Sequence, residues 1–239
     1  MDIYVIAIII LTAAIQSLFG VGVLLFGTPL LLLLGYPFSE SLLILLPVSA
    51  LINSLQIVKD YRYIDVKVYK NILLYSIPMI VIFLYLVSKI NLNVSLFIGI
   101  FLILIALKDF SFFVKHWLNK LLSFDKLFYI TMGVIHGVTN LGGALLTAKI
   151  FHTNLNKYQK RATIAISYMS FALFQILTLL FLNFKFNYAN IIYIFAGLVV
   201  YLIINKLFFH QISDQKYNKL FTLFLILSGL SLIFKGLVW

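Results

Sequence analysis

Long apolar stretches separated by short polar loops recur along the whole chain. Six of them have the length and composition of single membrane-spanning helices, since roughly 20 apolar residues cross about 30 Å of hydrocarbon. Pro47 and Pro78 lie inside two of these stretches and are expected to kink them, because proline removes a backbone hydrogen bond. The pattern predicts an all-α integral membrane protein, with spanning helices at residues 41–58, 71–88, 92–107, 162–182, 188–205 and 220–238.

Two further apolar segments are interrupted by glycine. Residues 3–34 are broken at Gly20-Val21-Gly22, and residues 127–151 at Asn140-Leu141-Gly142-Gly143. At a rise of ~1.5 Å per residue, the first segment is too long for one comfortable span. It is also too short for two full spans and a turn, so a re-entrant hairpin fits its length. Residues 127–151 could, on length alone, also form a single span.

The positions of lysine and arginine distinguish these arrangements. If both broken segments are re-entrant, the loops carry fifteen basic residues on one side of the membrane and three on the other. If each segment crosses once, the split becomes ten to eight. Basic loops face the cytoplasm, so the charges favour two hairpins and place both termini outside. The expected location is the plasma membrane, as a multi-pass protein of a prokaryotic inner membrane.

The order of elements divides the chain into two halves of the same design. Residues 1–107 contain the first hairpin and three helices, residues 108–126 form a cytoplasmic linker, and residues 127–239 contain the second hairpin and three helices. We therefore expect two inverted repeats, each a broken re-entrant helical hairpin followed by three transmembrane helices. Interrupted segments in matching positions of two halves indicate a transporter's binding site near the bilayer midplane.

Composition narrows the function further. Hydrophobic residues make up 63% of the 239 positions and charged residues 10%, which leaves no stretch for a soluble domain. The net charge of +11 is accounted for by the basic loops, so nucleic acid is not expected as a partner. The chain has no cysteine, and no acidic residue lies in the middle of an apolar segment. A carboxylate proton relay or a sodium site in the core is therefore not expected, and neither is a cofactor, a metal site or a catalytic residue.

Polar residues and glycines gather at the two breaks, where the second half-helix of each hairpin begins. A helix N-terminus carries free N–H donors and partial positive charge, which suits a small anion. Glycine lets a ligand approach the backbone closely, although small residues also serve helix packing alone. The expected substrate-binding residues are Gln16, Gly20, Gly22, Thr28, Ser49, Asn53, His136, Thr139, Asn140, Gly142, Gly143 and Thr147.

Individual members of this set have more than one interpretation. Asn140 can cap the half-helix that follows it, donate to a ligand, or do both. His136 can carry a proton or pack as a neutral ring. Ser49, Asn53 and Gln56 share one helical face, which either lines a cavity or bonds to a neighbouring helix. The helix after the second break adds further polar groups at Ser167, Tyr168, Ser170 and Gln175.

The basic residues near the second break are Lys149, Lys160 and Arg161. We expect them mainly to reach lipid headgroups and to set the orientation of the chain. A second interpretation has Lys149 or Arg161 at the inner mouth of the pathway, where it attracts anions.

The residues around both breaks resemble the sulfite exporter TauE/SafE family of membrane transporters. The resemblance rests on FGVGVLL at residues 19–25, TPLLL at 28–32, GYP at 35–37, NLGGALL at 140–146 and KRAT at 160–163, together with the element order. It implies transport of sulfite, sulfonates or related small anions, and a ligand-lining role for Gly20, Gly22, Asn140, Gly142 and Gly143. The glycine runs are thinner than is typical, and no proline follows the second one.

The sequence therefore predicts a secondary transporter or permease for a small anion, which the resemblance implies is a sulfur-containing one, embedded in lipid and compatible with a homo-oligomer. One alternative is a non-transporting membrane subunit or assembly factor, in which the breaks are only structural. A membrane-embedded enzyme is the other. It would need clustered acids and histidines, whereas the four histidines are scattered at positions 116, 136, 152 and 210.

Overall fold

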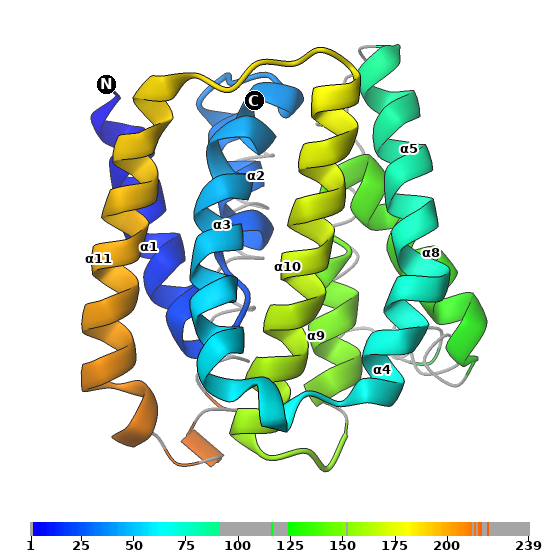
Figure 1. The fold of residues 1–239 in the computed structure, drawn as a ribbon, viewed down its shortest axis with the longest axis vertical. Helices are drawn as coiled ribbons and strands as arrows, with labels where there is room; N and C mark the ends of the chain where they lie inside the picture. The colour runs from blue at the N-terminus through cyan, green and yellow to red at the C-terminus, as the bar shows by residue number, and fades with distance from the viewer. Residues whose placement is uncertain are drawn as a thin grey trace.

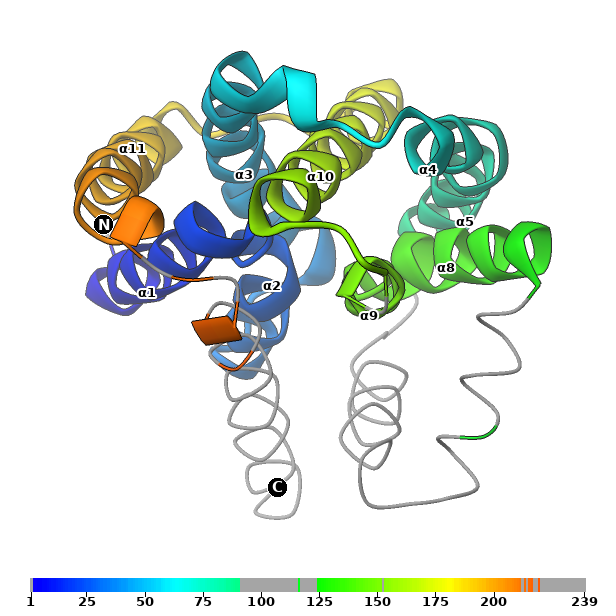
Figure 2. The same cartoon turned by 90° about the horizontal axis from the view of Figure 1, so that it is seen from below.

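The described helices form two layers. The computed structural model describes residues 2–90, 116, 124–151, 153–211, 213, 215, 216 and 219, and the regular elements among them are all helical. Seen from one end, α3, α5, α10 and α11 lie in one layer and α1, α2, α8 and α9 in the other (Figure 2). The first layer contains α3 (Phe38–Asp60), α5 (Ile77–Lys89), α10 (Lys157–Phe181) and α11 (Ile191–Leu207). The second contains α1 (Ile3–Phe19), α2 (Val23–Leu33), α8 (Asp125–Thr139) and α9 (Gly143–Phe151).

Among the described residues, the layer of α3, α5, α10 and α11 contains the helices that can span a membrane. Four helical stretches there are long and apolar enough to cross a membrane: Phe38–Tyr63, Val66–Lys89, Lys157–Phe181 and Tyr188–Leu207. They overlap the predicted segments 41–58, 71–88, 162–182 and 188–205. The predicted helices 92–107 and 220–238 and nearly all of the linker 108–126 lie outside the described residues, so the repeat boundaries stay a prediction. An all-α membrane protein is confirmed.

The first broken segment folds as a helical hairpin. Asp2 caps α1 by accepting a hydrogen bond from the Tyr4 N–H at 2.8 Å, and α1 ends at Gly20, whose φ of 76° is left-handed. After the break, α2 runs back alongside α1 (Figure 1). The Tyr36 hydroxyl, just beyond α2, donates to the Asp2 carboxylate at 2.9 Å. This bond ties the two open ends of the hairpin together.

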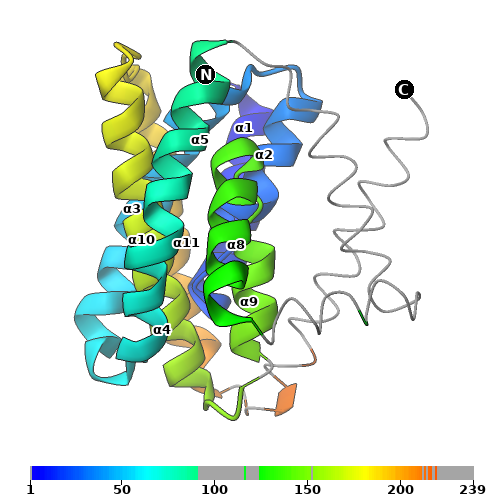
Figure 3. The same cartoon turned by 90° about the vertical axis from the view of Figure 1, so that its right-hand side faces the viewer.

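The second broken segment is a hairpin that points the other way. Its helix α8 ends at Asn140, which also has a left-handed φ, of 62°. The chain then turns back into α9, and an ion pair between Lys149 and Asp125 joins the open ends. In Figure 3, α8 and α9 open towards the end of the molecule opposite the N-terminus. The two breaks therefore face the interior from opposite directions.

The stretch before α5 carries a local distortion at a proline. Helix α4 (Val66–Asn71) passes into a π-helical turn at Ile72–Ser76, in which the Ile77 N–H donates to the Ile72 carbonyl. Pro78 follows at the start of α5. Proline cannot donate a backbone hydrogen bond and crowds the preceding turn. The wider π-helical turn relieves this crowding. Helix α3, in contrast, continues through Pro47.

Two glycines let α8 pack closely against α5. A Cβ atom added to Gly137 would lie 2.9 Å from the Ile80 carbonyl oxygen, and one added to Gly133 would lie 2.9 Å from the Cβ of Met79. Their spacing of four residues is the small-residue pattern that brings membrane helices together. It was present in the sequence but was not identified as a packing motif there.

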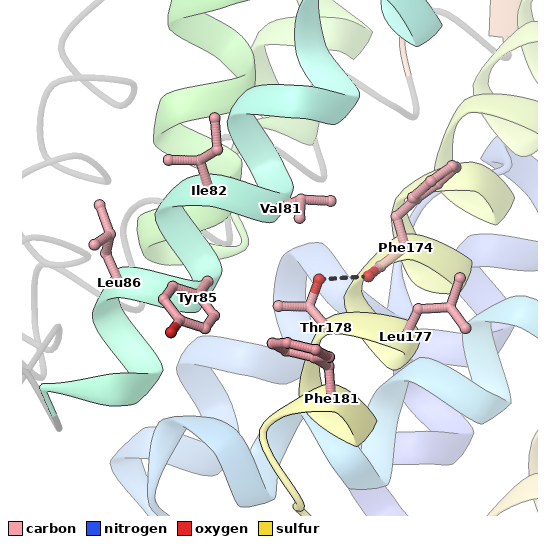
Figure 4. Close-up of a pocket in the computed structure, with 8 residues that line it drawn as sticks. All are labelled: Val81, Ile82, Tyr85, Leu86, Phe174, Leu177, Thr178 and Phe181. Atoms are coloured by element: carbon pink, nitrogen blue, oxygen red, sulfur yellow. Dashed lines mark hydrogen bonds between the residues drawn. The ribbon is translucent and has the colours of Figure 1, made fainter.

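On the other side of α5, a groove separates it from α10 (Figure 4). The groove has a volume of about 430 Å³ and an apolar lining, and the hydroxyl of Thr178 donates to the Phe174 carbonyl at 2.7 Å rather than facing a ligand. This lining suits lipid chains better than an anion. It is formed by Val81, Ile82, Tyr85, Leu86, Phe174, Leu177, Thr178 and Phe181.

We expect the Gly137→Val variant to lose stability, by about 1–3 kcal/mol, because the added atoms overpack the α5–α8 contact. The measurement is the thermal unfolding midpoint of the purified protein in detergent. Val134→Ile on the same helix, which adds one methylene at a half-buried position, is the control. Equal midpoints for Gly137→Val and the wild type would contradict the close packing.

The topology can be tested with single cysteines, since the chain has none of its own. Asp2 and Glu40 line one cavity of about 780 Å³ at the mouth of the first hairpin, so Asp2→Cys and Glu40→Cys should react with an impermeant maleimide from the same, outer side. Arg62→Cys, in the turn after α3, should react from the other side. Labelling of positions 2 and 40 from opposite sides would exclude the hairpin arrangement.

Candidate functional site

Side chains of α1 and α3 form a hydrogen-bonded group at the tip of the first hairpin. Gln16, fully buried near the end of α1, accepts a hydrogen bond from the Val23 N–H at 3.0 Å and so occupies the N-terminus of α2. Its amide nitrogen donates to the Ser49 carbonyl at 3.0 Å and to Asn53 Oδ1 at 3.1 Å. The polar face of α3 therefore bonds to a neighbouring helix, which decides between the two interpretations of that stripe.

The C-terminal end of α1 also has hydrogen-bond partners. Gln56 on α3 donates to the carbonyls of Gln16 at 2.8 Å and Ser17 at 3.2 Å. Arg161 adds a longer bond to the Ser17 carbonyl, at 3.4 Å. Since the last carbonyls of a helix have no partner within the helix, these contacts allow α1 to end inside the protein.

The glycines of the first break are closely packed. A Cβ on Gly22 would lie 2.6 Å from the Gln16 nitrogen, and one on Gly20 would lie 2.8 Å from the Arg161 carbonyl oxygen. Gly20 also needs its left-handed backbone conformation. In this structure Gly22 therefore allows the tip to pack closely against α1, and Gly20 allows it to pack closely against α10.

At the second tip, Asn140 joins three elements. Its amide donates to the Thr28 hydroxyl on α2 at 2.7 Å, and its side-chain oxygen accepts from Gln175 on α10 at 3.1 Å. The Asn140–Thr28 bond connects the two hairpins directly. Asn140 also ends α8 in a left-handed conformation. Its side chain is thus a bridge between elements, which differs from the expected capping of α9.

Beside this bridge lies a group of buried polar atoms without partners. In the part of the chain that the structure describes, eight buried side-chain nitrogen and oxygen atoms lack a hydrogen-bond partner. Four of them belong to His136 (both ring nitrogens), Tyr168 (hydroxyl) and Gln175 (Oε1), and among these the Gln175 side chain lies close enough to the His136 ring to interact with it. An unmet buried group costs about 1–3 kcal/mol, so their concentration in one place calls for an explanation.

These three side chains surround the start of α9. The rings of His136 and Tyr168 meet edge to face, with centroids 6.1 Å apart. A Cβ on Gly143, the first residue of α9, would collide with the Tyr168 hydroxyl, and one on Gly142 would lie 2.6 Å from the His136 Cβ. Only glycine leaves room for these polar groups to approach the helix N-terminus. Tyr168 and Gln175 were noted as polar in the sequence but were not included in the expected site.

The two threonines of the second tip are already bonded. Thr139 donates to the Ile135 carbonyl at 2.7 Å and accepts from the Leu141 N–H at 3.1 Å. Thr147 donates to the carbonyls of Gly143 and Ala144, both at 3.0 Å. All twelve residues expected at the site lie in the interior: none of their side chains is accessible from either end in this conformation.

The expectation that Arg161 reaches the lipid headgroups is wrong. Its side chain is fully buried and forms an ion pair with Asp60, itself 5% exposed. It donates to Asn205 Oδ1 at 2.8 Å, and its guanidinium carbon lies 3.3 Å from the centre of the Phe209 ring. Lys149 likewise pairs with Asp125 and lies over the Phe128 ring. For Arg161 the physical reason is that Asp60, far away in sequence, offers the cation a partner inside the protein, whereas the Lys149–Asp125 pair lies at the surface, with the Asp125 side chain 55% exposed.

At the opposite end of the molecule, the mouth of the first hairpin is acidic. Asp2 and Glu40 line its cavity together with Tyr36 and Asn187. Burial and the hydrogen bond to Asp2 raise the pKa of Tyr36 to about 12, so its hydroxyl remains a donor to Asp2 over the physiological range.

An all-helical membrane protein with two broken hairpins that enter from opposite ends and meet at polar, buried tips has the architecture of a solute transporter. A family model described as sulfite exporter TauE/SafE matches residues 5–232, nearly the whole chain. The chain therefore belongs to the TauE/SafE family and is a multi-pass membrane transporter, not an enzyme. No curated protein and no solved structure matches it in the same comparisons.

The two roles of Asn140 can be separated by substitution. Asn140→Gly preserves the left-handed backbone and removes only the side-chain bridge, whereas Asn140→Ala also strains the backbone, by about 1–2 kcal/mol. We expect Asn140→Ala to unfold at a lower temperature than Asn140→Gly, with both below the wild type. If the two variants have equal midpoints, the backbone conformation is not a constraint at this position.

Proposed function

We propose that this transporter carries a small sulfur-containing anion, such as sulfite or a sulfonate, and binds it at the start of α9. The observation that supports this most strongly is the buried polar group of His136, Tyr168 and Gln175 beside the start of α9, in which the Tyr168 hydroxyl has no partner. The family membership supports the chemical class of the substrate.

The chemistry around the start of α9 suits an anion. The N-terminus of a helix carries partial positive charge, although the N–H groups of Ala144 and Leu145 in the first turn of α9 already donate to the carbonyls of Leu141 and Gly142. The Tyr168 hydroxyl and a His136 N–H add donors from the side. No acidic side chain appears among these contacts, and within the described ranges no three histidine or acidic residues could together hold a metal ion. An oxyanion with several acceptor oxygens would complete these hydrogen bonds.

The first tip has a supporting function in this proposal. Its half-helix N-terminus is filled by Gln16, so the two tips are chemically unequal even though the hairpins are alike. Gln16, Ser49 and Asn53 then hold the shape of α2. Thr28 is the member of the first hairpin that reaches the substrate region, through its bond to Asn140.

The burial of both tips indicates a closed conformation. Access from either end requires the hairpins to move relative to α3 and α10, as in alternating access between repeats. The Thr28–Asn140 bond is the contact between the hairpins that such a movement would change. The basic end, with the turns at α3–α4 and α9–α10, would face the cytoplasm of a plasma membrane by the positive-inside rule.

Substrate binding can be measured with purified protein as a rise in unfolding temperature against sulfite, sulfate, thiosulfate, taurine, sulfoacetate and short carboxylates. A ligand that binds the folded state alone stabilises it by RT ln(1 + [L]/Kd), about 2.7 kcal/mol at 100 Kd. We expect a selective, saturable shift with one class of sulfur anion, and its loss in Tyr168→Phe and Asn140→Gly.

Ser54→Ala is the matched control. Ser54 lies on α3 in the same bundle, and its hydroxyl donates to the Ala50 carbonyl at 2.7 Å and contacts the Met169 sulfur on α10 at 3.3 Å, with no bond to either tip. This variant should keep the full shift. A sulfur anion that stabilises Tyr168→Phe and Asn140→Gly as strongly as the wild type would place the site elsewhere. No shift with any anion would contradict a sulfur-containing anion as the substrate.

A further inference from the structure

One face of α10 connects the substrate region to the basic end of the molecule. Arg161, Tyr168 and Gln175 are spaced seven residues apart, so they lie on one side of the helix, two turns from one another. At ~1.5 Å per residue the steps are about 10 Å each. All three side chains are fully buried, and each has a polar atom without a partner.

Both hairpin tips lie against this same face. Gly20 contacts α10 at Arg161 and Ala165, Gly143 contacts it at Tyr168, and Asn140 is bonded to Gln175. The sequence of contacts leads from Gln175 and Tyr168 at the second tip, past the first tip, to Arg161. Any path from the start of α9 towards the basic end that follows α10 therefore passes the guanidinium.

Arg161 is held in place by several weak contacts and one strong contact. The strong contact is the ion pair with Asp60 at the end of α3. The others are Asn205 on α11, the α1 carbonyl of Ser17, and the ring of Phe209. Together they join α1, α3, α10 and α11 at one point, while the Nε atom of the guanidinium has no partner.

We propose that Arg161 binds the transported anion at the inner end of its path, and that Asp60 occupies the guanidinium when no anion is there. This inference rests on the proposed function. An anion that arrives from the second tip or from the basic end would replace the carboxylate, because the guanidinium binds carboxylates and oxyanions with the same two-pronged geometry. The exchange would break the ion pair that joins the end of α3 to α10.

Two further cations lie near Arg161 on α10. Lys157 and Lys160, one helical turn or less from Arg161, are also mostly buried, at 8% and 5% exposure. Lys157 donates to the Phe209 carbonyl at 3.3 Å, and Lys160 lies over the Phe151 ring, 5.1 Å from its centre. This end of α10 is therefore rich in positive charge, which attracts anions.

The test compares four variants in uptake of radiolabelled sulfite by proteoliposomes that contain the full-length protein. They are Arg161→Gln, Asp60→Asn, the double variant Asp60→Asn/Arg161→Gln, and Lys206→Gln as control. Lys206 is an exposed cation at the same end, next to Asn205, so its loss removes equal charge but no buried contact. The control should transport like the wild type.

The double variant separates the two interpretations of the pair. A buried charge without its partner is strongly destabilising, but removal of both charges together is tolerated. Under the proposal, the double variant folds and unfolds near the wild-type temperature, yet its uptake falls to the level of empty liposomes. Wild-type uptake by the double variant would show that the pair is purely structural and would overturn the proposal.

A further variant, Arg161→Lys, decides the matter if the double variant does not fold. This change keeps a cation beside Asp60 but loses the two-pronged geometry of the guanidinium, so the sulfite concentration for half-maximal uptake should rise several-fold. An unchanged value would overturn the proposal. Absence of sulfite uptake by the wild type is a different result, since it contradicts sulfite as the substrate of the proposed function before Arg161 is considered.

Discussion

A helix that ends inside a membrane protein must find partners for its last carbonyl and first N–H groups, because lipid offers none. This requirement governs the whole arrangement of the two hairpins. At the first tip, Gln16, Gln56 and Arg161 supply those partners from α1, α3 and α10. At the second tip, the side chains next to the start of α9 are buried but lack partners. The two hairpins have the same design, but only the second tip leaves buried polar side chains with which a ligand could form hydrogen bonds.

The same requirement explains why α10 lies at the centre of the structure. The tips can approach it closely only where Cβ atoms are absent, at Gly20 and Gly143. Once in contact, each tip places polar groups on one face of the helix, where Tyr168 and Gln175 point into the second tip and Arg161 contacts the first. A spacing of seven residues keeps these groups in line. The glycines thus act through packing, and the packing determines which polar groups meet.

The hairpins could be predicted from the sequence because their signals are local. Segment length, glycine position and the distribution of lysine and arginine are all read without knowledge of distant contacts. The importance of Asn140 was predicted for the same reason, since it directly precedes the glycines. Its bonds to Thr28 and Gln175 could not be predicted, because they join residues 112 and 35 positions away.

The errors have a similar physical origin. Arg161 was expected at the headgroups because a lone arginine near a helix end usually extends to the surface, and its partner Asp60 lies 101 positions earlier. The saturation of the α2 N-terminus by Gln16 was missed because an amide in an apolar helix does not reveal its partner. By contrast, the seven-residue spacing on α10 and the Gly133–Gly137 pair are visible in the sequence. A search of each predicted helix for polar or small residues that recur on one face would have found both.

The unequal tips also bear on how binding and movement are coupled. A closed site with several unmet polar groups, each worth about 1–3 kcal/mol, is stabilised most by a ligand that meets all of them at once. A micromolar dissociation constant corresponds to about 8 kcal/mol, so this gain is of the right size to hold the closed form. Opening the inner end then requires separation of Arg161 from Asp60, which is unfavourable unless another anion takes the place of the carboxylate. The anion that stabilises the closed form is thus also the species that makes its opening possible.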